Sequence, residues 1–484
     1  MAGGRLNSKR ILYSQVRQQD GALRLNVEMS QTVRNSQKAE NASKIGPDRE
    51  KGRGNGSTQC DFEPYEHRAV HLPTNNLDTL LHVIKGIMGS GILAMPDAFK
   101  NSGYALGTAA TIFIGIVQSY CVHQLVRTAY ELSKRKQVAS MTYPETAREA
   151  MLAGPTWMKK LAPYAGTVVN VFIFSFQLGT CCVYFVFISS NLKRVCDIYF
   201  DPIDVRIYMC FILVPIILAN LVRNLKYLTP FSGISNVTIV SSLGITLYYV
   251  FRDGLGPISE KAAVGEARGF PLFFGTVLFA LTCIGMIMPL ENNMKRPKKF
   301  GGTFGVFNAA MVIIIFLYVT IGLLGYLKYG SGVMGSITLN LPEEEKLAQA
   351  VQIMIAIGVF LSYPLQCYVA IDIVWTQTLK PKLMEKKYKV LLPFELGVRV
   401  ALVVIPFALA VAIPKLGLFI SLVGALTLSI VAISLPPFME IGTFEHQRRG
   451  WRLIKNIALI IFGLLGLVTG TYVSIEDIVK SFST

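Results

Sequence analysis

The chain has 484 residues, of which 52% are hydrophobic and only 16% are charged, and its formal net charge is +17. The apolar residues fall in long uninterrupted runs, which excludes an ordinary water-soluble domain and indicates a protein embedded in lipid. The basic residues lie in short clusters between these runs, so the positive charge is typical of membrane topology signals and does not indicate a nucleic-acid partner.

Residues 1–75 predict a disordered N-terminal tail. They are rich in Ser, Asn, Gln, Gly and mixed charges, and they show no sustained apolar periodicity. The first ten residues contain no apolar stretch of the kind that a secretory signal peptide requires. We therefore expect the first spanning helix to serve as the insertion signal, and we assign residues 76–484 to a transmembrane domain.

The rest of the chain predicts an all-α polytopic membrane protein. A helix needs roughly 20 apolar residues to cross the hydrocarbon core, because each backbone amide must find its partner within the segment. We predict eleven spanning helices, at 78–98, 104–131, 163–192, 207–222, 228–251, 271–291, 303–327, 348–374, 392–412, 416–436 and 454–474. An odd number of spans places the two termini on opposite sides of the membrane.

Basic residues predict the orientation of these helices. The loops on the side of the N-terminal tail carry most of the Lys and Arg, whereas one of the opposite loops contains the acidic run Glu343–Glu345. The clusters are Lys134–Lys136, Arg148, Lys159–Lys160, Arg223 with Lys226, Lys295–Lys299, Lys380–Lys389 and Arg448–Arg452. Because basic loops stay in the cytosol, the tail is predicted to be cytosolic and the C-terminus extracellular or lumenal. The host membrane, either the plasma membrane or a lysosomal or endosomal membrane, stays open.

The first predicted helix contains three small residues near its middle, Gly89, Ser90 and Gly91, which weaken it there. Unpaired backbone groups at that depth are tolerated where they line a cavity or contact a substrate. The amides and carbonyls of an opened helix suit a zwitterion, because its carboxylate takes amides and its ammonium takes carbonyls. An equally good interpretation is that Gly89 and Gly91 allow close packing of helices.

The sixth predicted helix is also weakened, by Gly285 and Pro289. Helices one and six open the two halves of a five-plus-five arrangement, and paired interruptions in matching positions indicate an inverted-repeat transporter with its site near the midplane. Gln177 and Tyr184 in the third helix, and Tyr363 with Gln366 in the eighth, are candidates to line that site. Each of them could equally form a hydrogen bond between helices.

Four ionisable residues within spans need separate interpretations. His82 and Lys85 lie three residues apart and share a face on the cytosolic half of helix one. His82 is a candidate proton carrier because histidine titrates near neutrality, although it could instead be an interfacial residue bonded to a neighbouring helix. Lys85 is expected to extend to the cytosolic surface. Glu395 and Arg399 are spaced for a structural ion pair on one helix.

Four stretches of the chain form a recognisable set: His82–Leu93, Gln177–Phe187, Pro289–Asn292 and Ser336–Pro342. In their order and spacing they resemble the proton-coupled amino acid transporter family, and insect-like members are the most similar. The resemblance runs from about residue 76 to the end. It implies a LeuT-like fold with 11 transmembrane helices in a 5+5 inverted repeat, in which helices 1 and 6 are broken. It also implies small neutral amino acids such as glycine, alanine and proline as substrates, protons as the coupled ion, and a role for His82 in proton coupling.

The chain departs from that family in its sixth helix. Leu281-Thr282-Cys283 stands where the family usually has Phe-Glu-Gly, so a buried carboxylate is missing at the presumed site. Thr282 and Cys283, with Gly285, are therefore the candidate substrate contacts in this helix. Two other functions stay open: an amino acid sensor that signals to a cytosolic partner through its tail, and an uncoupled amino acid facilitator. No nucleophile, metal or nucleotide-binding constellation stands out, so we expect neither enzymatic activity nor a cofactor.

Overall fold

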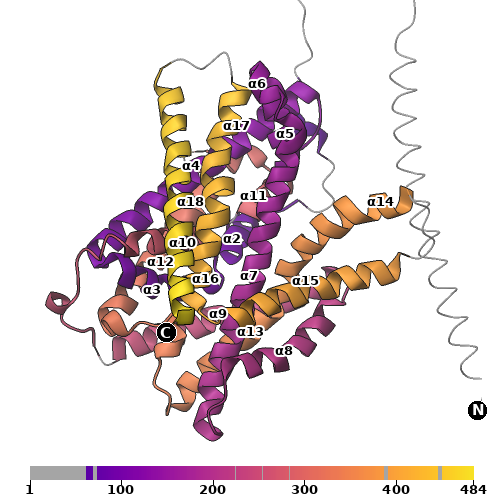
Figure 1. The fold of residues 1–484 in the computed structure, drawn as a ribbon. Coiled ribbons are helices and arrows are strands. Elements are labelled where there is room, and N and C mark those ends of the chain that lie inside the picture. Colours follow the sequence, from indigo (N-terminus) through magenta and orange to yellow (C-terminus); the bar gives the residue numbers. More distant parts are fainter. Residues whose placement is uncertain are drawn as a thin grey trace, which may run out of the picture. The chain divides into compact units, whose positions relative to one another are not determined.

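The computed structural model describes residues 62–68, 73–223, 225–252, 254–282, 284–302, 304–385, 391–444 and 450–483, and in these residues the chain is built from helices (Figure 1). By length and apolar character, nine of the described helices could cross a membrane, or ten when one bent pair is counted as a span. The single β-bridge among the described residues pairs Thr74 with Met294. The prediction of an all-α polytopic membrane protein is confirmed.

Each predicted segment coincides with one or more helices, whose ends differ from the prediction by a few residues in most cases. The N-terminal half contains α2 (Asn76–Ile87), α3 (Met95–Ser102), α4 (Tyr104–Lys136), α7 (Ala162–Tyr199), α8 (Val205–Asn220) and α9 (Leu225–Arg252). The next helices are α10 (Gly269–Leu281), α11 (Ile284–Asn292), α12 (Val306–Tyr329), α13 (Lys346–Ile371) and α14 (Lys380–Glu385). The last are α15 (Leu392–Ala412), α16 (Leu416–Val423), α17 (Leu435–Thr443) and α18 (Trp451–Ser483). Two π-helical stretches, Asp372–Leu379 and Gly424–Ser434, join α13 to α14 and α16 to α17.

The predicted fourth span, 207–222, corresponds to α8, which has 16 residues. At about 1.5 Å per residue it is shorter than the ~30 Å of hydrocarbon that a span crosses. Two short helices, α5 (Tyr143–Ala153) and α6 (Thr156–Lys159), were not predicted. A capping box starts α5, since the Glu145 carboxylate accepts the Thr142 amide at 2.8 Å. This helix packs on α7 and supports its first turns.

Helix α7 forms the centre of the core. Its residues 183–187 are buried on every side, with Val183, Phe185, Val186 and Phe187 fully inaccessible. It packs against α13, α15, α16 and α5, whereas α18 lies beside α17 with most of its surface uncovered (Figure 1). A helix that is apolar all round belongs in the interior, which explains why α7 holds the other elements in place.

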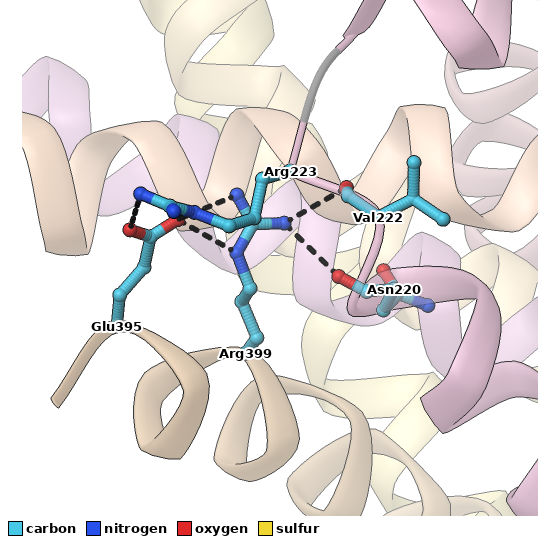
Figure 2. Close-up of polar contacts among 5 residues, drawn as sticks. All are labelled: Asn220, Val222, Arg223, Glu395 and Arg399. Atoms are coloured by element: carbon cyan, nitrogen blue, oxygen red, sulfur yellow. Dashed lines mark hydrogen bonds and ion pairs between the residues drawn. The ribbon is translucent and has the colours of Figure 1, made fainter. Parts of the chain in front are cut away.

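An ion-pair network with two buried members, Glu395 and Arg399, fixes the end of α8 to α15 (Figure 2). Arg399 donates to Glu395 at 3.1 Å and to the Asn220 carbonyl at 3.0 Å, so it caps carbonyls that have no partner at the end of α8. Arg223 also donates to the Glu395 carboxylate, at 2.8 Å. The predicted ion pair between Glu395 and Arg399 is therefore confirmed, and its surroundings give it a structural role.

Candidate functional site

Helix one is interrupted at the position that the sequence predicts. The α-helix α2 ends at Ile87, Met88 and Gly89 leave the helical conformation, and a 3₁₀ turn resumes at Ser90 before α3. The segments on the two sides of this joint are bent by 48°. The joint leaves the carbonyls that end α2 and the amides that begin the 3₁₀ turn without helical partners. These are the polar backbone groups that the sequence pattern anticipates.

Helix six is interrupted too, at a different residue from the predicted ones. Its first half, α10, ends at Leu281, and Thr282 adopts an extended conformation with φ −80° and ψ 140°. Gly285 and Pro289, which were expected to cause the break, both lie inside the second half, α11. This part of the prediction was wrong. Gly285 lies in the first turn of α11, where backbone amides lack helical partners in any helix, so a glycine there does not by itself mark the break. Cys283 lies outside the described residues.

Two glycines bring the broken helices together. A methyl group added at Gly91 would come within 2.7 Å of the Ala280 Cα atom, so the backbones of the 3₁₀ turn and α10 touch. A methyl group at Gly86 would overlap the side chain of Met286 in α11. Gly91 is therefore a packing glycine, the role that the alternative interpretation gave it. A methyl group added at Gly89 would have only the Ile87 carbonyl oxygen nearby, at 3.9 Å, and Gly89 instead occupies the non-helical joint.

Tyr318 in α12 contacts the interruption of helix one directly. Its fully buried hydroxyl donates to the Ile87 carbonyl at 2.8 Å, the last carbonyl of α2. A buried tyrosine that satisfies this carbonyl holds the joint in the bent form. Sequence reasoning missed this residue, although a tyrosine in the middle of the apolar segment 303–327 was the available signal.

The third and eighth predicted spans contribute a group of buried polar residues close to Tyr318. Tyr184 of α7 lies near Tyr318, and its ring centroid is 6.4 Å from that of Tyr363 in α13. Gln366 donates to the Tyr184 hydroxyl at 3.5 Å. The Tyr363 hydroxyl and the Gln177 carbonyl oxygen are buried and have no hydrogen-bond partner among the described residues. The structure thus brings Tyr184 and Tyr363 together, and it leaves the Tyr363 hydroxyl on α13 and the Gln177 carbonyl oxygen on α7 without partners.

Thr282 lies beside a small cavity at the break in helix six. The cavity has a volume of about 10 Å³ and is lined by Thr282, by Gln118 of α4, and by apolar residues of α12. The Thr282 hydroxyl and the Gln118 carbonyl oxygen have no hydrogen-bond partner within the described part of the chain. Two breaks, in helix one and helix six, are therefore each accompanied by buried polar atoms.

His82 and Lys85 share one exposed face of α2, as their spacing predicts. The opposite stripe of the helix, Thr79, Val83 and Ile87, is buried. Among the described residues, His82 makes no hydrogen bond or ion pair. The structure therefore places His82 on the side of α2 away from its packed face, and does not bond it to the tyrosines.

The segment ahead of α2 contributes a cluster that sequence reasoning missed, which we call the N-terminal clamp: Tyr65, Arg68 and Glu291. Arg68 forms a bidentate ion pair with Glu291 of α11 at 3.0 Å, and the two side chains are 9% and 3% exposed. The Arg68 guanidinium also lies 4.5 Å from the Tyr65 ring centroid. Burial and the nearby Glu291 carboxylate raise the pKa of Tyr65, so its hydroxyl stays protonated beside that carboxylate.

Two further contacts surround the clamp. The Thr74 amide donates to the Asn293 carbonyl at 2.9 Å, and the Lys295 amide donates back to the Thr74 carbonyl at 3.0 Å. Arg68 also donates to the Ala139 carbonyl at 3.1 Å, in the loop after α4. The entry to α2 is therefore bonded to the end of helix six and to the loop beyond α4.

Comparison with known proteins gives concordant matches over most of the chain. Residues 73–476 match the model of the family described as "Transmembrane amino acid transporter protein". The Drosophila melanogaster protein named "Proton-coupled amino acid transporter-like protein pathetic" is 39% identical over 427 residues, which cover 87% of this chain and 89% of that protein. The Arabidopsis thaliana protein named "Amino acid transporter AVT3A" is 26% identical over 413 residues, or 83% of this chain and 90% of that protein.

Proposed function

Because the chain belongs to the family of transmembrane amino acid transporter proteins, we propose that it is a proton-coupled symporter of small neutral amino acids such as glycine, alanine and proline. It is a multi-pass membrane protein and a transporter, not an enzyme. In this proposal α8 is the fourth of eleven spans, and the first ten form a 5+5 inverted repeat of the LeuT-like kind. The observation that carries the proposal is the contact between two interrupted helices, one and six.

The substrate is bound between the two interruptions. Gly89, Ser90 and Gly91 offer backbone amides to its carboxylate, and the carbonyls that end α2 and α10 accept its ammonium. Thr282, Cys283 and the backbone of Gly285, which an alanine there would keep, contribute from helix six, and Gln177, Tyr184 and Tyr363 contribute from the facing helices. The buried atoms without partners at Thr282, Gln177 and Tyr363 support this assignment.

His82 is the proposed proton carrier. It lies on the half of helix one that follows the basic, cytosolic end of the chain, and its exposed face would allow proton exchange with water on that side. The same charge pattern supports a cytosolic tail and an extracellular or lumenal C-terminus. The host membrane is then the plasma membrane or a lysosomal or endosomal membrane. Across each of these membranes, a solution that is more acidic on the non-cytosolic side would drive uptake toward the cytosol.

Uptake of radiolabelled glycine, alanine and proline tests this function. With the protein directed to the cell surface, uptake is expected to be several-fold faster at outer pH 5.5 than at pH 7.5, because a proton gradient supplies the driving force. His82→Ala should remove most of the acid stimulation while leaving surface expression unchanged. Uptake that follows the substrate gradient alone at both pH values would instead identify an uncoupled facilitator.

The sensor alternative has a separate readout in the same cells. A transporter keeps its flux when residues 1–61 are deleted, because these precede the clamp and α2. A sensor would bind amino acids without measurable uptake and would lose its effect on a cytosolic partner in the deleted form. Absence of uptake in confirmed surface-expressed protein, together with retained binding, would overturn symport.

Tyr318→Phe tests the joint in helix one. Removal of the hydroxyl takes one of two donors from the Ile87 carbonyl, which keeps the Gly89 amide at 2.7 Å, and the loss of this hydrogen bond costs about 0.5–1.5 kcal/mol in the bent form. We expect alanine uptake to fall several-fold, with normal surface expression. Tyr472→Phe is the matched control, because Tyr472 is exposed on α18. Unchanged uptake by Tyr318→Phe would show that this hydrogen bond does not hold the joint.

A further inference from the structure

A second cavity lies on the outer side of the helix-one interruption. It has a volume of about 530 Å³, within the range of small-molecule sites, and is bounded by α3, α7, α10, the turn Ile337–Asn340 and the junction of α15 with α16. Its lining is mixed, with apolar side chains, two charged residues, Asp97 and Lys415, and the polar side chains Asn101, Ser190 and Thr276. None of these residues belongs to the central site described above.

Asp97 is the acidic residue of this cavity and is available to a ligand. It lies in the first turn of α3, is half-buried, and makes no hydrogen bond or ion pair with any residue that the structure describes. One carboxylate oxygen lies directly against Gly417, since a methyl group added at Gly417 would overlap it. The carboxylate therefore reaches from α3 across to the start of α16.

Lys415 is the basic residue of the cavity. It immediately precedes α16, is exposed, and within the described ranges has neither a hydrogen bond nor an ion pair. The other nearby cation, Lys100 on α3, donates to the Val333 carbonyl at 3.0 Å and is engaged there. Asp97 and Lys415 thus border the same cavity from different elements, and neither is paired with a residue that the structure describes.

We propose that this cavity is an additional, outer binding site for zwitterionic amino acids. Asp97 binds the ammonium group and Lys415 the carboxylate, and the side chains of Asn101, Ser190 and Thr276 supply further hydrogen bonds. A zwitterion matches the two opposite charges at once, which a proton or a simple ion does not. The inference rests on the proposed function: the site would receive the substrate before it moves to the interruptions in helices one and six.

Alanine uptake by the full-length protein tests the site through KM. Asp97→Asn and Lys415→Gln are each expected to raise KM roughly ten-fold at a fixed outer pH, the effect of losing one charge-assisted contact, with Vmax preserved. Asp201→Asn, which removes an exposed carboxylate outside the cavity, should keep the wild-type KM. Gly417→Ala displaces the Asp97 carboxylate without removing its charge and should also raise KM.

Several results would overturn the outer site. An Asp97→Asn variant with unchanged KM excludes it, and one that loses acid stimulation at unchanged KM makes Asp97 a proton acceptor instead. If Asp97→Asn does not reach the cell surface, Gly417→Ala decides by the same criterion. If the wild type shows no uptake, the proposed function fails on its own. Equilibrium binding of radiolabelled alanine to purified wild type and Asp97→Asn then tests the site, and equal affinities exclude it.

Discussion

Replacing Arg68 with alanine is expected to lower alanine uptake at least ten-fold and to lower the thermal unfolding temperature of the purified protein. The substitution leaves the Glu291 carboxylate buried at 3% exposure without its partner, which costs about 3–5 kcal/mol. A penalty of that size shifts the population away from the state in which the N-terminal clamp is closed. Radiolabelled uptake and a thermal melt in detergent measure the two effects.

The double variant and a surface control make this prediction specific. Arg68→Ala combined with Glu291→Gln removes the unpaired charge and should recover most of the lost thermal stability, without restoring a closed clamp. Lys298→Gln breaks the ion pair between Lys298 and Glu63. Because the Lys298 side chain is 71% exposed, this change should alter the free energy of unfolding by less than about 1 kcal/mol. An Arg68→Ala variant that resembles Lys298→Gln in both measurements would show that the clamp has no role.

Gly91→Ala is expected to abolish transport, whereas Gly285→Ala should retain it. At Gly91 an added methyl group lies 2.7 Å from the Ala280 Cα atom, and a backbone cannot move aside as a flexible side chain can. The helices must therefore separate, and overpacking of this kind costs about 1–3 kcal/mol in addition to displacing the interruption in helix one. At Gly285 nothing lies within 4 Å of an added methyl group.

Uptake normalised to surface expression compares the two variants. The pair is matched because each replaces one glycine with alanine beside an interruption, so helix propensity alone would affect both in the same direction. Equal loss of uptake in both variants would mean that backbone flexibility, and not the contact between helices one and six, sets the requirement for glycine.

The spanning helices could be predicted because a long apolar run in this chain has few stable structures other than a helix within the membrane. The segment 392–412 coincides with α15, and the spacing of Glu395 and Arg399 correctly gave their ion pair. The position of the break in helix six could not be predicted in the same way. Glycine and proline mark where a helix is weak, but packing between α10 and the rest of the core decides where it opens.

The clamp and the short helix α5 were missed for different reasons. Arg68 and Glu291 are 223 residues apart, and an arginine in a polar segment gives no local sign that it will be buried. The capping box of Thr142 and Glu145 did signal α5, but this helix is too polar and too short to be found as a span. For His82, spacing gave the face shared with Lys85 correctly, yet which face the neighbouring helices cover depends on tertiary packing.

The contact between Gly91 and Ala280 constrains how the molecule can move. Because the two backbones touch, with no side chains between them to slide past one another, α3 and α10 are expected to travel as one rigid body. In that case one wall of the outer cavity, with Asp97 and Thr276, moves together with α3 and α10. The opposite wall, with Ser190 and Lys415, stays in place. The distance between the charges of Asp97 and Lys415 would change with each transport cycle. The cavity would therefore bind a zwitterion tightly in one state and weakly in the other.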